Sequence, residues 1–395
     1  MSLKRRQFLI LSGLAGGFGL ILAHKALTKA NRPNGLSSLT SDSVPTLGTP
    51  AQVSNKDATM QSNPAPKGLF APPRGDVRIV VISDLNSQYG ATSYEPEVDK
   101  AIALIPDWQP NLVLCGGDMV AGQSPSLTRA EIQAMWEAFD QHVSAPLRRT
   151  NLPFGFTIGN HDASGALAIK GNFLFKQERE WAAAYWNDPK HDPGLRFVDR
   201  AGFPFYYSFQ QDDIFYLVWD ASTSRIPPEQ LAWAEKILNS STAQTAKIRV
   251  VIGHLPLYAV AVGRDESGEV LGQAEELRSL LERHRVHTYI SGHHHAYFPG
   301  HRGQLELLHT GALGSGPRPL LSSALPTRKT LTVVDVNLSS QSTTYTTYDM
   351  SNLKVVDHRQ LPRIIVGPNG MVLRRDVQWE ELTPQEQSLR YTPSS

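Results

Sequence analysis

The fold of this chain is decided by the stretch VRIVVISDLN, residues 77–86. Its first six residues are rich in β-branched side chains, as in a strand that is buried on both faces. Polar residues follow at once, with Asp84 and Asn86 directly after the expected strand. In open α/β sheets, ligands bind beyond the carboxyl ends of the strands, because those ends share one edge. The stretch therefore predicts an α/β domain with a binding site at the end of this strand.

Strand-like and helix-like segments alternate from this stretch to about Leu313, which is the pattern of a layered α/β domain. Strands are expected at Val77–Ser83, Leu112–Gly116, Phe154–Ile158, Ile214–Trp219, Ile248–Ile252 and Thr288–Ser291. Helices are expected at Glu97–Ile105, Thr128–His142, Asn172–Trp186, Pro228–Leu238 and Ala274–His284. Antiparallel strands that complete the sheets are expected at Leu305–Thr310, Leu331–Val336 and Thr343–Tyr348.

The composition is that of an ordinary globular protein that can bury a large core. Of the 395 residues, 41% are hydrophobic and 19% are charged, so one large domain with appendages is expected. A formal net charge of +1 gives no electrostatic reason to expect nucleic acid as a partner. Cys115 is the only cysteine, so no intrachain disulfide can form, and its place in an apolar run predicts a buried thiol.

Five of the expected strands end in short clusters of residue types that bind metals, and four of these clusters begin with glycine. The clusters are Asp84-Leu85-Asn86, Gly117-Asp118, Gly159-Asn160-His161-Asp162, Gly253-His254 and Gly292-His293-His294-His295. One such cluster alone is more often a turn than a site. Five in succession favour a shared site, since carboxylate, amide and imidazole together suit borderline-hard divalent metals.

This ordered set of motifs resembles the calcineurin-like metallophosphoesterase superfamily over about Val77 to Leu313. The resemblance implies an α/β sandwich, in which two central mixed β-sheets are flanked by helices and two divalent metal ions (Mn, Fe or Zn) are held at one end. It implies a metal-dependent phosphoesterase, in which a hydroxide shared by both ions attacks the phosphorus of a small-molecule phosphate ester. Phosphomonoesters and phosphodiesters are both consistent with the motif set.

Carried over residue by residue, the resemblance gives each ion its ligands. The first ion would be bound by Asp84, Asp118 and His295, and the second by Asp118, Asn160, His254 and His293, with Asp118 bridging. His161 would protonate the leaving oxygen, and Asp162 would hold the His161 ring in orientation. His294 is expected to turn away from the ions, toward solvent or the substrate loop. Further candidates for substrate contact near the motif loops are Tyr89, Tyr258, Tyr297, His301 and Arg302.

One position departs from the family pattern. Asn86 stands where the family usually has a histidine, so we expect it to line the first site as a weaker ligand or to leave a place for water. Purple acid phosphatases carry a tyrosine where this chain has Ala121, and the chain is therefore not assigned to that subfamily. The alternatives are a metal- or phosphate-binding protein with a degenerate first site, and a metal-dependent hydrolase of another bond.

The two ends of the chain differ in composition from the domain. Basic residues 4–6 precede an apolar stretch that reaches Ala23, which resembles a twin-arginine export signal. We therefore expect an exported protein, periplasmic or extracytoplasmic, with an uncleaved N-terminal membrane anchor as the alternative. The predicted organisation is a signal peptide or anchor (1–28), a low-complexity linker (29–75), the catalytic domain (76–350) and a C-terminal extension (351–395).

Overall fold

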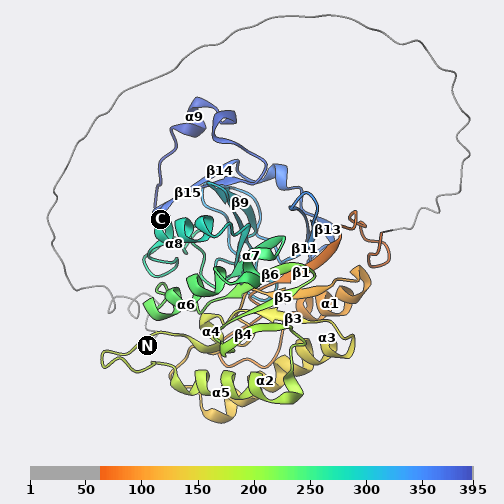
Figure 1. The fold of residues 1–395 in the computed structure, drawn as a ribbon, viewed down its shortest axis with the longest axis vertical. Coiled ribbons are helices and arrows are strands. Elements are labelled where there is room, and N and C mark those ends of the chain that lie inside the picture. The colour runs from red at the N-terminus through yellow and green to blue at the C-terminus, as the bar shows by residue number, and fades with distance from the viewer. Residues whose placement is uncertain (1–62, 394–395) are drawn as a thin grey trace, which may run out of the picture. The chain divides into compact units, whose positions relative to one another are not determined.

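Two β-sheets lie face to face in the computed structural model, which describes residues 63–393 (Figure 1). The first has six strands in the order β13-β12-β11-β1-β2-β3, and the second has nine in the order β14-β15-β9-β10-β8-β7-β6-β5-β4. The strands are β1 (Val77–Ile82), β2 (Leu112–Cys115), β3 (Phe154–Phe156), β4 (Phe197–Gly202), β5 (Tyr206–Gln211), β6 (Ile214–Val218), β7 (Ile248–Ile252), β8 (Thr288–Ser291), β9 (Phe298–Arg302), β10 (Leu305–His309), β11 (Thr330–Asn337), β12 (Ser342–Asp349), β13 (Lys354–Val355), β14 (Ile364–Gly367) and β15 (Gly370–Arg374).

Helices connect the parallel strands and cover the outer faces of the sheets. They are α1 (Pro96–Leu104), α2 (Arg129–Phe139), α3 (Ala145–Arg149), α4 (Asn160–Ala163), α5 (Lys176–Asn187), α6 (Pro228–Leu238), α7 (Ser241–Thr245), α8 (Ala274–Arg283) and α9 (Pro384–Gln387), with short 3-10 or π segments η3 (Ile105–Trp108), η4 (Asp140–Ser144), η5 (Pro189–His191), η6 (His358–Gln360) and η7 (Trp379–Glu381). Figure 1 shows α6 and α8 on the opposite side of the strands from α1 and α3. Among residues 63–393, no helix combines the length and apolar character needed to cross a bilayer.

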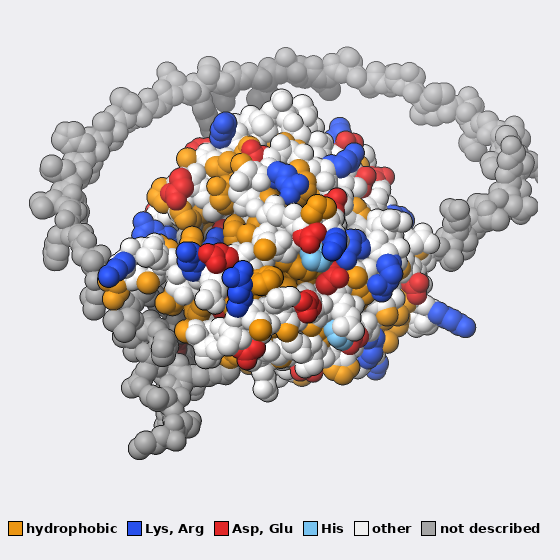
Figure 2. All heavy atoms as spheres, turned by 90° about the horizontal axis from the view of Figure 1, so that it is seen from below, with side chains coloured by type: hydrophobic (Ala, Val, Ile, Leu, Met, Phe, Trp, Pro, Cys, Tyr) orange, Lys and Arg blue, Asp and Glu red, His pale blue; other side chains and the backbone are white. Residues whose placement is uncertain are grey.

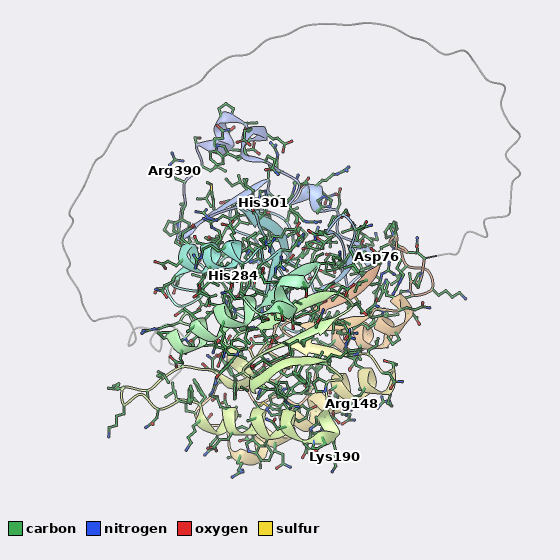
Figure 3. All side chains as sticks on the ribbon, viewed as in Figure 1. Asp76, Arg148, Lys190, His284, His301 and Arg390 are labelled. Atoms are coloured by element: carbon green, nitrogen blue, oxygen red, sulfur yellow. The ribbon has the colours of Figure 1, made fainter. Side chains whose placement is uncertain are left out.

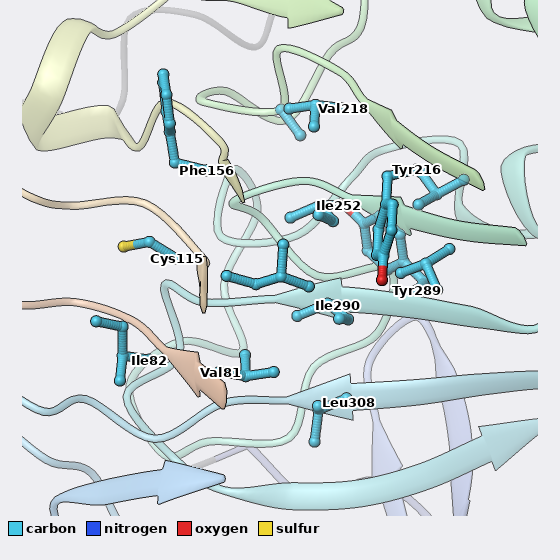
Figure 4. Close-up of a cluster of buried hydrophobic side chains, with 14 of the residues drawn as sticks. Val81, Ile82, Cys115, Phe156, Tyr216, Val218, Ile252, Tyr289, Ile290 and Leu308 are labelled. Atoms are coloured by element: carbon cyan, nitrogen blue, oxygen red, sulfur yellow. The ribbon is translucent and has the colours of Figure 1, made fainter. Parts of the chain in front are cut away.

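The core lies between the sheets and is built by the alternation of side chains along each strand. Val81 of β1 faces Ile290 of β8 and Leu308 of β10 across this layer (Figure 4). All six residues of β1 are buried, which is the two-sided burial that the opening stretch predicted. The same run of apolar residues thus contributes both to the layer between the sheets and to the contact with the helices.

The six central strands that the sequence predicted are all present, with ends that differ by two residues or fewer. β1, β2 and β3 are parallel neighbours in the first sheet, and β6, β7 and β8 are parallel neighbours in the second. Their carboxyl ends therefore lie at a common edge, which brings the predicted polar clusters together. Leu305–His309 is a correction to the expected antiparallel strand, because it pairs in parallel with β8 as well as antiparallel with β9.

The predicted boundaries of the domain need two corrections. Residues 63–75 lie on the folded unit, since the buried Arg78 guanidinium donates to the carbonyl oxygens of Pro64 and Pro72 at 2.9 and 2.8 Å. Residues 63–75 are therefore not part of a linker, and the rest of the expected linker lies outside the described residues. The C-terminal extension also belongs to the fold, because β13 joins the first sheet and β14 and β15 join the second. The expected export signal or anchor (1–28) lies outside the described residues.

Candidate metal centre

Asp118 stands at the middle of the cluster that forms where the two sheets meet. Its carboxylate and one ligand atom each of His254 and His293 lie within 4.8 Å of one another, and so do those of Asp84, Asp118 and His295. Asp118 belongs to both groups and is buried, so one carboxylate is shared by the two groups of candidate ligand atoms. The structure thus brings together five of the side chains that the sequence analysis selected, although their binding of metal stays a prediction.

Asn160 adds a neutral oxygen to the same place. Its Oδ1 lies 2.9 Å from Nε2 of His254, while its Nδ2 donates to Oε1 of Gln123 at 2.7 Å. Gln123 therefore fixes which end of the amide faces the centre, because an amide nitrogen cannot bind a cation. No sequence motif indicates Gln123, since a lone glutamine in a loop belongs to no recognisable pattern.

The ligand backbone is held in a conformation that side chains other than glycine rarely adopt. Asp84, Asp118, His293 and His295 have φ values of 51°, 55°, 65° and 54°. Such left-handed residues cost about 1–3 kcal/mol each and persist only where the surroundings dictate them. Hydrogen bonds supply part of that restraint, because Asp84 accepts from the His293 backbone N–H at 3.0 Å and from the Ser83 hydroxyl at 2.6 Å.

Two glycines of the motifs are required by close packing against the carboxylates. A Cβ at Gly159 would collide with the Asp118 carboxylate, and one at Gly292 would lie 2.7 Å from Oδ2 of Asp84. Neither glycine has a positive φ, so space alone excludes a side chain at these two positions. The Gly-Asn-His and Gly-His motifs therefore carry glycine for the approach of one loop to the ligand of another.

Two of the histidines are held through Nδ1, so that Nε2 faces the centre. Nδ1 of His254 donates to the Gly116 carbonyl at 2.7 Å, and Nδ1 of His295 donates to the Gly316 carbonyl at 2.9 Å. Because a carbonyl only accepts, Nδ1 carries the hydrogen and Nε2 is the nitrogen that faces the carboxylates. Fixing a ring through its outer nitrogen is the usual way in which proteins orient metal-binding histidines.

The His293 ring is held through Nε2 instead of Nδ1, and its buried Nδ1 has no hydrogen-bond partner among the described residues. Its Nε2 donates to Oε2 of Glu269 at 2.8 Å. Burial, together with the nearby Arg264, holds the pKa of His293 well below its usual range, so the ring is neutral and Nδ1 keeps its lone pair. A bare buried nitrogen beside Asp118 fits a cation.

The charges of the centre are balanced by its own side chains. Burial alone would lower the pKa of His254, but the Asp118 carboxylate raises it to about 9. Burial alone would raise the pKa of Asp118, but His254 and His161 hold it below its ordinary value. The carboxylate is therefore ionised and attracts positive charge, which a bound cation would supply in place of the imidazolium.

The predicted role of Asp162 is wrong. Its carboxylate accepts hydrogen bonds from four backbone N–H groups and holds two motif loops together, instead of orienting the His161 ring. The donors are the backbone N–H groups of Asp118, Met119, Val120 and Gly159, at 2.9, 2.6, 2.9 and 2.8 Å. His161 is oriented by the Gly122 carbonyl, 3.0 Å from its Nδ1, and by the Tyr89 ring, whose centroid lies 5.1 Å away.

The expectation for His294 is half right. Its ring does not join either ligand group, but it is fully buried and does not face solvent. Its Nδ1 accepts from the Val260 backbone N–H at 3.3 Å, and its Nε2 donates to the Glu269 carbonyl at 3.0 Å. His294 therefore helps to hold the segment that carries Glu269.

Two of the further candidates for substrate contact are engaged elsewhere. Nε2 of His301 on β9 bonds to the Val377 carbonyl at 2.8 Å, toward the C-terminal strands (Figure 3). Arg302 forms an ion pair with Glu275 at 2.7 Å. Both side chains therefore stabilise contacts around the second sheet. The sequence analysis selected them only because they lie close to the motifs along the chain.

Asn86 lies beside the loop of Asp118, because its backbone N–H donates to the Asp118 carbonyl at 3.2 Å. The residue is buried, with a relative exposure of 5%. Its position is thus compatible with the first ligand group, while its binding of metal stays a prediction.

Comparison with known proteins agrees with this geometry. The sequence profile named Metallophos, calcineurin-like phosphoesterase, matches residues 77–297. The serine/threonine-protein phosphatase CPPED1 of mouse is 23% identical over 248 residues, which are 58% of this chain and 69% of the mouse protein.

Among solved structures, the purple acid phosphatase PPD1 from yellow lupin seeds matches with a TM-score of 0.50 and 16% identity. The match covers 71% of this chain and 52% of the lupin chain, so the chain spans about half the length of that enzyme. At this identity the likeness concerns the fold alone, and it confirms the predicted pair of mixed sheets with flanking helices.

Proposed function

The chain belongs to the calcineurin-like phosphoesterase family, which confirms the predicted enzyme class, and we propose that it hydrolyses phosphate esters at a centre of two divalent cations. The observation that carries this proposal is the position of Asp118, whose carboxylate is shared by two groups of ligand atoms. In the reaction, the oxygen of water bonds to phosphorus, the ester P–O bond breaks, and the leaving oxygen takes up a proton.

Two cations at this place would lower the pKa of a coordinated water and neutralise the charge that builds on the phosphoryl oxygens. The chain contributes the fixed geometry. Asn160 provides an oxygen without adding negative charge, which keeps the site attractive to an anionic phosphate. His161, which donates from its backbone N–H to Asp118 at 2.8 Å, is held beside the ligands and is the residue that we assign to the leaving oxygen.

The side chains of the first site, among them His295 and the expected Asn86, influence which metal ion this site prefers. The donor set around Asp84 is poorer in imidazole than the set around His254 and His293, so we expect the first site to prefer a harder ion such as Mn²⁺. Fe and Zn²⁺ are suited to the second site. An Asn86→Ala variant with unchanged metal content and activity would argue against a role for this amide.

The test uses the full chain, stripped of metal and then titrated with Mn²⁺, Fe²⁺ or Zn²⁺. Elemental analysis is expected to find two bound equivalents, and soluble chromogenic phosphate mono- and diesters report hydrolysis. Asp118→Asn should lose both ions and the activity, whereas Asp107→Asn, an exposed aspartate in η3, should lose neither. Binding of metal without hydrolysis of any ester would favour the alternative, a metal- or phosphate-binding protein.

A further inference from the structure

Residues 165–174, between α4 and α5, form a hairpin that projects from the side of the folded unit (Figure 1). Leu167 and Phe173 pair in an antiparallel bridge, so their side chains lie on the same face of the ribbon. Gly171 closes the turn with a φ of +80°, and its N–H donates to the Ala168 carbonyl at 2.8 Å. We call this segment the apolar hairpin.

The apolar hairpin exposes large hydrophobic side chains to an unusual degree. Leu167, Ile169, Phe173 and Leu174 have relative exposures of 61%, 101%, 43% and 51%. They are four of the ten large hydrophobic side chains that are exposed among residues 63–393, and they fall within eight consecutive residues. Single exposed hydrophobic residues are ordinary, but a cluster of them marks a surface that binds something.

The base of the hairpin is fixed to the folded unit. The guanidinium of Arg179 lies 4.3 Å from the centroid of the Phe173 ring and pairs with the buried Asp220 at 2.8 Å. The N–H of Gly165 donates to the Ser222 hydroxyl at 2.9 Å. These contacts hold the hairpin in its projecting position, so the exposure of its tip is a property of the fold.

The shape and charge of the hairpin indicate which kind of partner binds to it. A stable protein partner needs roughly 800 Å² of fitting surface on each side, which a narrow, convex ribbon does not offer. The hairpin contains Lys170 and no acidic residue, and Lys176 follows at the start of α5, where it pairs with Glu180 at 3.5 Å. Apolar side chains flanked by lysines suit the surface of a bilayer that contains anionic lipids. Figure 2 shows hydrophobic and basic side chains together on the projecting left edge of the described surface.

We propose that the apolar hairpin inserts its tip into a membrane that contains anionic lipids. The hairpin follows α4 directly, and α4 carries Asn160 and His161, so docking brings the candidate metal centre to the level of the lipid head groups. The substrate is then a phosphate ester in a lipid head group. This last step rests on the proposed function, whereas the docking does not.

The docking is tested in the full chain with a dye at the tip. Cys115 is the only cysteine and is buried, so Ile169→Cys gives one accessible thiol for an environment-sensitive fluorophore. Val355→Cys is the matched control, since Val355 is 41% exposed and lies on β13, an edge strand of the first sheet and not part of the hairpin. Both proteins carry the same N-terminus, so membrane binding through that segment cannot cause a difference between them.

With phosphatidylglycerol vesicles, we expect a blue shift of the dye at residue 169 and its quenching by lipid-borne quenchers, and no change at residue 355. Pure phosphatidylcholine vesicles should give a smaller response. An unchanged spectrum at residue 169, or equal changes at both positions, overturns the proposal and leaves a protein partner as the occupant.

The substrate class is tested by activity on two esters. A Leu167→Ser/Ile169→Ser variant should hydrolyse vesicle-borne phosphatidic acid about tenfold more slowly and a soluble phosphate ester at the normal rate. Equal loss on both esters, or loss on neither, contradicts a lipid substrate. A blue shift at residue 169 without hydrolysis of any ester would contradict the proposed function and leave the docking standing.

Discussion

The carboxylate of Glu269 accepts a hydrogen bond from Nε2 of His293 at 2.8 Å, which leaves Nδ1 of the same ring as the bare atom of the centre. Arg264 donates to the same carboxylate oxygen at 2.6 Å, so Glu269 is itself held in place. A carboxylate behind a histidine sets the tautomer and raises the basicity of the ring toward a cation. Glu269 is therefore a positioning residue for His293.

Replacing Glu269 should weaken metal binding without removing a ligand. For Glu269→Ala we expect about a 10–100-fold loss of affinity at the second site, because the His293 ring is no longer held in one tautomer. Calorimetric titration of the metal-free protein with Zn²⁺ measures this change. Glu266→Ala, an exposed glutamate of the same loop, is the control, and equal affinities for the two variants would contradict the role of Glu269.

Asp162 and His161 should give opposite results, although they are adjacent. Asp162→Ala leaves four buried N–H groups without an acceptor, each worth about 1–3 kcal/mol, so the free energy of unfolding should fall by at least about 3 kcal/mol. His161→Asn should slow hydrolysis by roughly 100- to 10,000-fold and change the free energy of unfolding by less than about 1 kcal/mol. Urea unfolding and steady-state kinetics on both variants separate the two roles. A stable Asp162→Ala protein with slow hydrolysis would restore the original assignment to catalysis.

The strands that the sequence predicted best are those with a continuous apolar run between clear boundaries. Ile248–Ile252 and Thr288–Ser291 agree with the structure to the residue, since glycine follows each run and limits it. The strand Phe197–Gly202 was not predicted, because it lies at the sheet edge with three exposed residues and a mixed polar sequence. Asn172–Trp186 was predicted as one helix, but its first residues belong to the apolar hairpin.

The clustering of the candidate ligands could be predicted from the sequence, because each follows a strand and has a side chain of a metal-binding type. Their supporting partners could not, since Glu269 and Gln123 come from loops with no periodicity and reach the centre only through the tertiary fold. Asp162 shows the opposite case. Asp162 follows His161 directly in the sequence, which favoured a contact between the two side chains. In α4 the Asp162 carboxylate does not bond to the His161 ring.

Gln123 controls the orientation of the Asn160 amide. Its replacement should therefore change the metal affinity of the second site. Gln123→Ala frees the amide to turn, so we expect about a tenfold loss of metal affinity. Gln123→Glu keeps an acceptor for the Asn160 amide hydrogens and should bind metal nearly as well as the unchanged protein. Gln133→Ala, an exposed position on α2, is the control. If Gln123→Ala binds Zn²⁺ as tightly as Gln133→Ala does, Asn160 does not need this contact.

The loop that carries Gln123 is held by Glu178 of α5, and this contact makes a prediction about pH. Glu178 is 3% exposed, and its carboxylate accepts from the backbone N–H groups of Gln123 and Ser124 at 2.9 and 3.3 Å. Burial raises the pKa of Glu178 to about 7 from a usual value of 4.5. Between these values the folded protein holds a proton that the unfolded chain has released.

The contribution of Glu178 to stability is therefore complete below about pH 4.5 and is lost as the pH rises through about 7. Glu178→Gln cannot titrate, so the fall in the free energy of unfolding from pH 5 to pH 8 should be smaller in this variant, by roughly 1–3 kcal/mol. Urea unfolding at both pH values gives the four free energies that are needed, and groups that titrate elsewhere cancel in the comparison. Glu180→Gln, at an exposed position on the same helix, should keep the pH dependence of the unchanged protein. If Glu178→Gln keeps it as well, the Glu178 carboxyl is ionised in the folded protein at pH 5, and its two backbone donors outweigh the cost of burial.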